Sequence, residues 1–335
     1  MIDLPIRLVH ADLYYQRMGR HDVSHQSTFF EPSISLRNSL WEVNAKMSSE
    51  LPDLTTMVDY RDDSNPLNIM RGNPQLRDIH EYDINANRTF RGKKQMQLNV
   101  NVGYHQTDNA VAYGLTFDKQ TGISTIQPMS VNGNRKYDMG VGYTRALDKS
   151  EKVTIDNQMS CTCNRNVDMA MVEGYTESQR SIVNNWLMGD VLKLNYRSND
   201  NYEFSLHSGG NYYLINSKRD GFSNIHAGDY NIGMNAQISL PWKFQVTTDL
   251  TMFARRGYQQ HEMNATNWIW NAQLTRSFIK GKLLAKLQGF DMLHQLSNTQ
   301  YMMNAQGRTE TWRNSIPRYV MFSLSWRFNV NPQGH

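Results

Sequence analysis

The stretch RYVMFSLSWRFNV, residues 318–330, alternates apolar and polar side chains with hardly a break. In an extended strand successive side chains point to opposite faces, so this stretch predicts one apolar face and one mostly small or polar face. The apolar face would carry Val320, Phe322, Leu324, Trp326 and Phe328. Such a strand fits either a sheet whose apolar faces meet in a dry core or a membrane barrel whose apolar face meets lipid.

The same period of two recurs in segments 95–104, 136–145, 231–240 and 244–252. Helical spacing fits none of these segments. Their polar faces carry mainly Asn, Gln, Ser, Thr and Gly, with few Lys or Glu residues. The exposed face of a soluble sheet usually carries more charge. A neutral, hydrogen-bonding face is more typical of the inner wall of a water-filled barrel.

Composition supports an all-β barrel. The apolar content of the 335 residues is 39%, whereas ordinary globular proteins contain roughly 45–50%. A barrel with a wet interior needs an apolar residue only at every second strand position. The aromatic content of 11% argues against a disordered chain. The net charge of +4 is small and the basic residues are scattered, so no nucleic-acid partner is predicted.

The predicted connections alternate between short and long. Segments 240–243 and 279–282 read as tight turns. Segments 166–181, 257–267 and 298–317 read as long loops. Short turns at one end of the strands and long loops at the other are the pattern of outer-membrane barrels.

Aromatic residues gather near the predicted strand ends. Trp268 and Trp270 lie two positions apart at the start of one strand, on the same face. Two such bulky rings suit a girdle at a lipid–water boundary, although cross-strand packing in a core is the alternative. At roughly ten residues per strand the chain holds about fourteen strands. No change of composition divides residues 1–335, so they are predicted to form one domain.

Two segments resemble a known family. Segment 59–90 holds SNPLNI and then GNPQL directly before an alternating stretch, and segment 281–295, GKLLAKLQGFDMLHQ, precedes a long loop and the final strand. From about residue 28 onward the chain resembles the TonB-dependent-receptor-like outer-membrane β-barrel family. The signature residues of the first segment are Asn65, Pro66, Leu67, Asn68, Gly72, Asn73 and Pro74. Asn-Pro and Gly-Asn-Pro initiate turns, which agrees with a loop at this place.

The resemblance implies an antiparallel transmembrane barrel in the outer membrane of a Gram-negative bacterium. It also implies that the final strand, through Phe328, is read by the barrel-assembly machinery. Complete receptors of this type have a TonB-contacting segment, a plug domain and a barrel of 22 strands. Nothing in the sequence resembles a plug, a TonB-contacting segment or a signal peptide. We therefore expect the C-terminal portion of a longer, 22-stranded barrel; a complete smaller barrel is the alternative.

No group of residues predicts a catalytic, cofactor or metal site. The segment HEMN, 261–264, lacks the second histidine of a zinc-protease motif. Cys161 and Cys163 would share one strand face, too far apart for an easy disulfide and without partners at zinc spacing. The aspartates of segment 53–63 do not have the spacing of a known calcium loop. The chain is not expected to be an enzyme.

Three functions remain open from the sequence. The leading hypothesis is the wall of an uptake channel whose long outer loops bind a substrate that the sequence does not identify. Its partners would be the lipid bilayer, the assembly machinery and, through a plug outside this sequence, the TonB energy-coupling system. The alternatives are a structural or adhesive barrel that transports nothing, and a soluble all-β binding protein.

Overall fold

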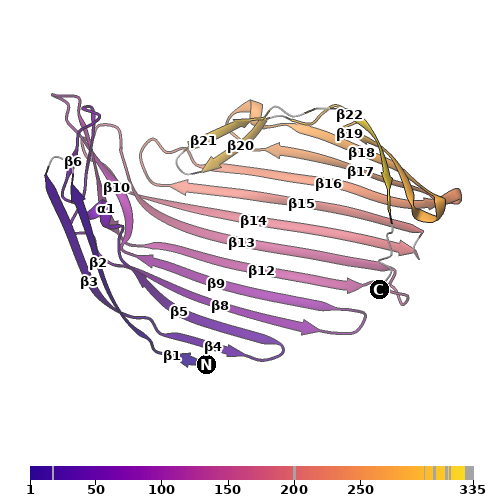
Figure 1. Cartoon of the computed structure of the whole chain (residues 1–335), viewed down its shortest axis with the longest axis horizontal. Helices are drawn as coiled ribbons and strands as arrows, with labels where there is room; N and C mark the ends of the chain where they lie inside the picture. The colour runs from indigo at the N-terminus through magenta and orange to yellow at the C-terminus, as the bar shows by residue number, and fades with distance from the viewer. Residues whose placement is uncertain are drawn as a thin grey trace, which may run out of the picture.

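The computed structural model describes residues 1–16, 19–198, 201–297, 299–304, 307–313, 316 and 318–328. One antiparallel sheet of fourteen strands dominates this part of the chain, as the sequence predicted (Figure 1). In spatial order its strands are β1 (Ile2–Asp3), β4 (Ser33–Arg37), β5 (Trp41–Glu50), β8 (Ile79–Arg91), β9 (Gln97–Asp108), β12 (Asn134–Ala146), β13 (Val153–Ala170), β14 (Gln179–Ser198), β15 (Tyr202–Ser217), β16 (Ile225–Leu240), β17 (Phe244–Arg256), β18 (Thr266–Phe278), β19 (Leu283–Phe290) and β22 (Tyr319–Trp326).

Smaller elements flank the sheet. A four-stranded accessory sheet has the order β10 (Ala110–Phe117), β11 (Ser124–Val131), β7 (Asn68–Arg71) and β6 (Arg61–Asp62). Two further hairpins are β2–β3 (Ile6–Gln16 and Arg20–Phe30) and β20–β21 (Thr299–Asn304 and Gly307–Trp312). The helices among the described residues are the single turn α1 (Leu54–Met57) and three short 3-10 turns at Pro241–Lys243, His261–Met263 and Ile279–Gly281. No helix in the described ranges is both long and apolar enough to cross a bilayer.

The strand ends form two unlike rims. We call one the turn rim; its connections are 38–40, 92–96, 147–152, 241–243 and 279–282. We call the other the loop rim; its connections include 51–78, 109–133, 171–178, 218–224 and 257–265. Figure 1 shows α1, β6 and β10 at the loop rim, to the left of the large sheet. The predicted alternation of short and long connections is therefore confirmed.

One predicted loop is shorter than expected. Segment 166–181 was predicted to be irregular, but β13 and β14 pair without interruption as far as Ala170 and Gln179. Only 171–178 remains as a connection. The backbone hydrogen bonds between β13 and β14 continue past the residues in which apolar and polar side chains alternate. The alternation alone therefore predicted strand ends that come too early.

One face of the sheet is apolar and uncovered. Leu206 on β15 lies directly opposite Met234 on β16, which lies opposite Leu250 on β17. Leu206 is 57% exposed and Met234 is 50% exposed. The buried apolar residues lie mostly at the loop rim instead, among them Met57, Leu76 and Met263. The apolar faces of the strands therefore do not stack into a dry core.

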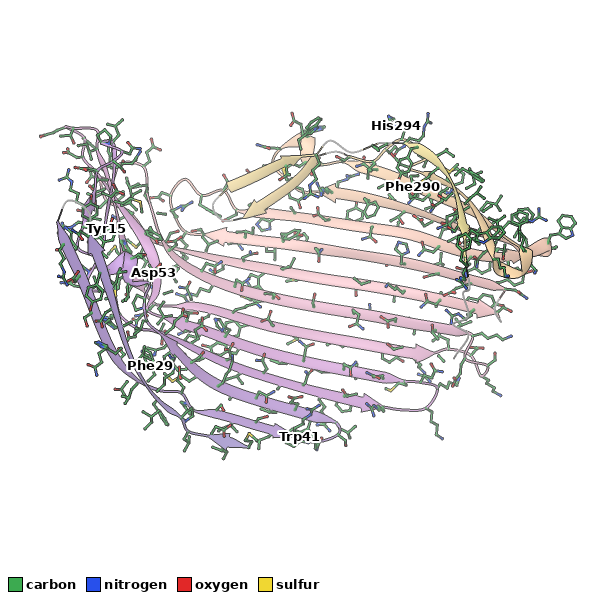
Figure 2. All side chains as sticks on the ribbon, viewed as in Figure 1. Tyr15, Phe29, Trp41, Asp53, Phe290 and His294 are labelled. Atoms are coloured by element: carbon green, nitrogen blue, oxygen red, sulfur yellow. The ribbon has the colours of Figure 1, made fainter. Side chains whose placement is uncertain are left out.

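Aromatic residues border this apolar face at both rims. Toward the loop rim it carries Tyr104, Tyr137, Trp186, Tyr212, Tyr230 and Trp268. Toward the turn rim it carries Trp41, Phe90, Tyr196, Phe204, Phe244, Phe278 and Trp326. Trp41 marks the turn rim in Figure 2. Two such belts flanking an apolar band are the girdles of a membrane barrel.

The sheet has two open edges. At one end β22 pairs, among the described residues, with β19 alone. At the other end β4 pairs with β5, and its second side meets β1 over only two residue pairs, Ile2↔Ile34 and Asp3↔Ser33. Unpaired strand edges are not stable in hydrocarbon because their N–H and C=O groups find no partner. Within a bilayer this sheet requires further strands or closure on itself.

Candidate functional site

The polar face of the sheet is a wall on which amide side chains lie against glycines. Asn101, Gly140 and Ser160 are consecutive partners across β9, β12 and β13. A Cβ atom added at Gly140 would lie 2.2 Å from Asn101 Oδ1, so the glycine makes room for the amide to lie along the wall. Gly189 continues the same row and lies close to the hydroxyl of Ser160. The result is a shallow polar hollow in the centre of the sheet.

Neutral hydrogen bonds connect this wall. Thr89 donates to Asn99 Oδ1 over 2.9 Å, and Gln288 donates to Gln273 Oε1 over 2.8 Å. The carboxylates of the wall are also engaged: Thr162 donates to Asp138 Oδ1 over 2.8 Å. These hydrogen bonds fix the side chains of the wall, which keep free lone pairs and N–H groups for water or a polar occupant.

A charged cluster lies where the polar wall reaches the loop rim. Tyr258, in the loop 257–265, donates to Asp229 Oδ1 on β16 over 2.8 Å. Arg255 Nε lies 3.6 Å from the same carboxylate oxygen. Burial and the hydrogen bond to the Asp229 carboxylate both raise the pKa of the Tyr258 hydroxyl. The cluster therefore ties the loop to the polar face, and its Asp229 and Arg255 line a pocket together with Phe253 and Asn231.

A further hollow lies on the wall toward the turn rim. Its lining includes Lys193, Glu203, His207 and Asn235. His207 Nε2 is 3.3 Å from the hydroxyl of Thr251, whereas its Nδ1 atom is buried and has no hydrogen-bond partner among the described residues. Together the three hollows follow the polar wall from the loop rim to the turn rim.

The signature loop is a structural junction at the loop rim. Asn73 donates from Nδ2 to the carbonyl of Pro128 over 2.9 Å and accepts at Oδ1 from the amide of Gln75. A Cβ atom at Gly72 would lie 1.8 Å from the carbonyl oxygen of Val58. The hydrogen bond from Asn73 joins the 51–78 segment to β11 of the accessory sheet, which the sequence did not predict.

The remaining signature residues form the turn before that sheet. Asn65 accepts at Oδ1 from the amide of Leu67, and its carbonyl accepts from the amide of Asn68. Asn68 begins β7 and pairs in parallel with Ser124 of β11. Pro66 lies inside this turn and Pro74 inside the next one. Asp53 caps α1 nearby by accepting from the amide of Thr55, and Figure 2 shows it beside the hairpin that carries Tyr15 and Phe29.

The final strand lies where the alternation placed it. Val320, Phe322, Leu324 and Trp326 all lie on the exposed apolar face of β22. Phe328 is 81% exposed but follows the strand, which ends at Trp326. Its ring centroid lies 6.1 Å from that of Trp326. The predicted continuation to Val330 falls partly outside the described residues.

The two cysteines lie on the same face of one strand. Cys161 and Cys163 are free thiols on the apolar face of β13, facing Met188 and Trp186. Within the described part of the chain, no group of three or more His, Cys, Asp or Glu side chains is arranged to hold a metal ion.

With this geometry in place, comparison with known proteins identifies the family. The model of the outer membrane protein beta-barrel family matches residues 7–326. The chain belongs to this family. Family membership places it in the outer membrane of Gram-negative bacteria. The soluble alternative is therefore wrong. The apolar face meets lipid and the polar face lines the lumen.

Several solved outer-membrane proteins are distantly similar. The ferric enterobactin receptor PfeA in complex with BCV-L6 is 12% identical, with a TM-score of 0.48, over 90% of this chain and 44% of that one. The copper transporter OprC is 9% identical, with a TM-score of 0.44, over 86% and 46%. A FadL homologue from Pseudomonas aeruginosa is 9% identical, with a TM-score of 0.35, over 96% and 87%. This chain thus spans less than half of the first two proteins. No curated protein matches the sequence.

Outer-membrane barrels have short turns in the periplasm and longer loops outside the cell. The turn rim is therefore periplasmic and the loop rim extracellular. Sequence reasoning found both rims and both faces. It missed the Asp229–Arg255–Tyr258 cluster, because these residues come from two strands and a loop whose pairing register is not visible in a single sequence.

Proposed function

We propose that this chain forms the C-terminal part of the wall of a larger outer-membrane uptake channel of the TonB-dependent type. The open edges of the sheet carry the proposal: in the described part of the chain, β22 and β4 both lack a full partner on one side. Strands from elsewhere in the complete protein would close the barrel, and a plug domain would occupy the lumen. The substrate would enter from the loop rim.

The polar wall supports a lumen filled by protein. Its glycines have no side chains, so the wall projects little into the lumen, and its amides offer neutral hydrogen bonds. Asn101, which lies against Gly140, is an example. A folded domain can dock there through many neutral contacts. Coupling to TonB would act through that domain, and the exposed edge of β22 would be available to the assembly machinery during insertion.

The alternative is a structural or adhesive barrel that moves nothing. The loop rim is extensive and carries the accessory sheet and the hairpins. Such a rim favours a structural or adhesive barrel as much as a substrate-binding one. The two functions differ in what occupies the lumen and whether that occupant can be displaced.

Conductance of the complete protein, extracted from its bacterium and placed in a planar bilayer, separates these functions. A plugged channel is silent at first and conducts once moderate urea unfolds the plug, because the closed barrel ladder withstands urea that a separately folded domain does not. An open pore at the outset would contradict the plug. Silence at every urea concentration that leaves the barrel folded would favour the structural barrel.

A further inference from the structure

A cationic pocket at the loop rim opens on the lipid-facing side of the wall. It lies at the loop-rim ends of β13, β14 and β15, at the left of the sheet in Figure 1. Its charged lining residues are Arg165, Arg180, Lys218, Arg219 and Asp220. Four cations thus share the pocket with one carboxylate.

The register of the strands shows on which face of the sheet this pocket lies and at what level of the membrane. Cys163 faces Trp186 across the β13–β14 ladder, and Arg165 faces Asn184 two residues further toward the loop rim. Arg165 and Asn184 therefore lie on the lipid-facing side, one step beyond the outer aromatic belt that includes Trp186. Because that belt lies at the membrane boundary, the pocket is level with the head groups of the outer leaflet.

The cations of this region outnumber the carboxylates among the described residues. Arg165 lies directly opposite Arg135 of β12, and like charges in this position destabilise a strand pair. Arg165 Nε is buried and has no hydrogen-bond partner among the described residues. Arg180 donates to the backbone carbonyl of Asn132 over 2.8 Å, which satisfies a donor but not its charge.

Arginines elsewhere on the same face are accommodated differently. Near the turn rim, the Arg88 guanidinium lies 4.6 Å from the centroid of the Phe90 ring. Arg276 lies 4.6 Å from the ring centroids of both Phe244 and Phe278. Arg276 Nε, like Arg165 Nε, is buried without a hydrogen-bond partner among the described residues, but Arg88 and Arg276 both have ring partners. The directly opposed pair Arg135–Arg165 instead calls for an anion supplied from outside the chain.

The available anion at this depth is lipid phosphate. Guanidinium groups match phosphate oxygens in paired hydrogen bonds, and lysine adds a point charge. The outer leaflet of the Gram-negative outer membrane consists of glycolipid whose sugar head group carries phosphates. We propose that Arg135, Arg165, Arg180 and Lys218 bind the phosphate groups of this phosphorylated glycolipid, lipopolysaccharide, from the lipid side.

Native mass spectrometry of the complete purified protein, titrated with bisphosphorylated lipid A in a zwitterionic detergent, tests the proposal. The double variant Arg135→Gln/Arg165→Gln should bind lipid A about a hundredfold or more weakly, because the charged hydrogen bonds of two guanidinium groups are lost. The variant Arg88→Gln, on the same face but at the other leaflet, should bind as the parent does. The double variant Arg135→Lys/Arg165→Lys, which keeps both charges, should retain most of the binding.

Chemical variants of the probe distinguish the source of the anion. Dephosphorylated lipid A should fail to bind, and inorganic phosphate alone should not displace bisphosphorylated lipid A. Heat-modifiable gel mobility shows that the glutamine variant is folded. Undiminished binding of bisphosphorylated lipid A by that folded variant would overturn the proposal. So would equal binding of the dephosphorylated lipid, or saturation of the pocket by inorganic phosphate.

Discussion

At the scale of single residues, the loop rim depends on a close backbone approach at Gly72. A Cβ atom there would lie 1.8 Å from the Val58 carbonyl oxygen, which cannot rotate away as a flexible side chain would. The Gly72→Ala change should therefore force the two backbone segments apart, at roughly 1–3 kcal/mol. It should break the hydrogen bond from the Gly72 amide to the Tyr60 carbonyl, which is 3.3 Å long.

Hydrogen exchange within segment 51–78 measures this effect. Amides of the segment should exchange about tenfold faster or more in Gly72→Ala, while the strand amides of the barrel keep their protection. Gly209→Ala is a suitable control, because its nearest new contact is 3.3 Å, to the side-chain nitrogen of Asn231. Equal protection of segment 51–78 in both variants would show that Gly72 is not required there.

The periplasmic turn 147–152 depends on the charge of Asp148. Its carboxylate accepts from the Ser150 hydroxyl and, over 2.9 Å, from the Val153 amide. The hydrogen bond from the Ser150 side chain, followed by that from the Val153 amide, lowers the pKa of Asp148 to about 2. Because the folded pKa lies below the unfolded value of about 3.9, the stabilisation is complete above that value and is lost as pH falls toward 2.

Carboxyl carbon NMR of aspartate-labelled protein checks this titration, with Asp148→Asn identifying the signal. The carboxylate should titrate near pH 2, and the Val153 amide should lose protection from exchange between about pH 4 and pH 2. A titration near the ordinary aspartate value would contradict the role of these hydrogen bonds.

At the scale of elements, each strand should tolerate charge on one face only. Met234 lies on the lipid-facing side of β16 between Leu206 and Leu250, and Asn235 follows it on the lumen side, opposite Asp249. Met234→Arg should destabilise the barrel by about 2–4 kcal/mol, because the guanidinium enters hydrocarbon. Asn235→Arg should be tolerated, because it meets water and a carboxylate.

Urea-dependent folding into lipid vesicles compares these two variants. The midpoint should fall for Met234→Arg and stay near that of the parent for Asn235→Arg. Equal destabilisation by both substitutions would count against the assignment of faces.

The elements also show what the sequence could and could not predict. Alternation located β9, β12, β16 and β17, but the β9 strand begins at Gln97 rather than at the predicted Gln95. Gln95 has a φ of 54° and belongs to the preceding turn, which alternation does not reveal. The accessory sheet was missed because its strands are short and pair across distant segments, as Asn68 does with Ser124. Contacts of that kind depend on tertiary structure.

At the scale of the whole molecule, two sides of one sheet face two solvents. The exposed band through Leu206 and Met234 requires hydrocarbon, and the amide wall through Asn101 and Gln158 requires water or a polar occupant. The number of strands was predictable from length and turn spacing, because each crossing of the bilayer needs about ten residues. That the sheet has open edges depends on which strands pair with which, and only the structure reveals this pairing.

The orientation of the two faces is the claim on which every other conclusion depends. Spin labels placed one at a time at positions 231–238 of β16, in a variant with Cys161 and Cys163 replaced by alanine, test it directly in lipid vesicles. The labels at even positions, beginning with Ile232 and Met234, should be accessible to oxygen dissolved in the bilayer. Those at odd positions should be accessible to a water-soluble nickel chelate. A reversed pattern, or oxygen accessibility without a period of two, would contradict a lipid-facing apolar side.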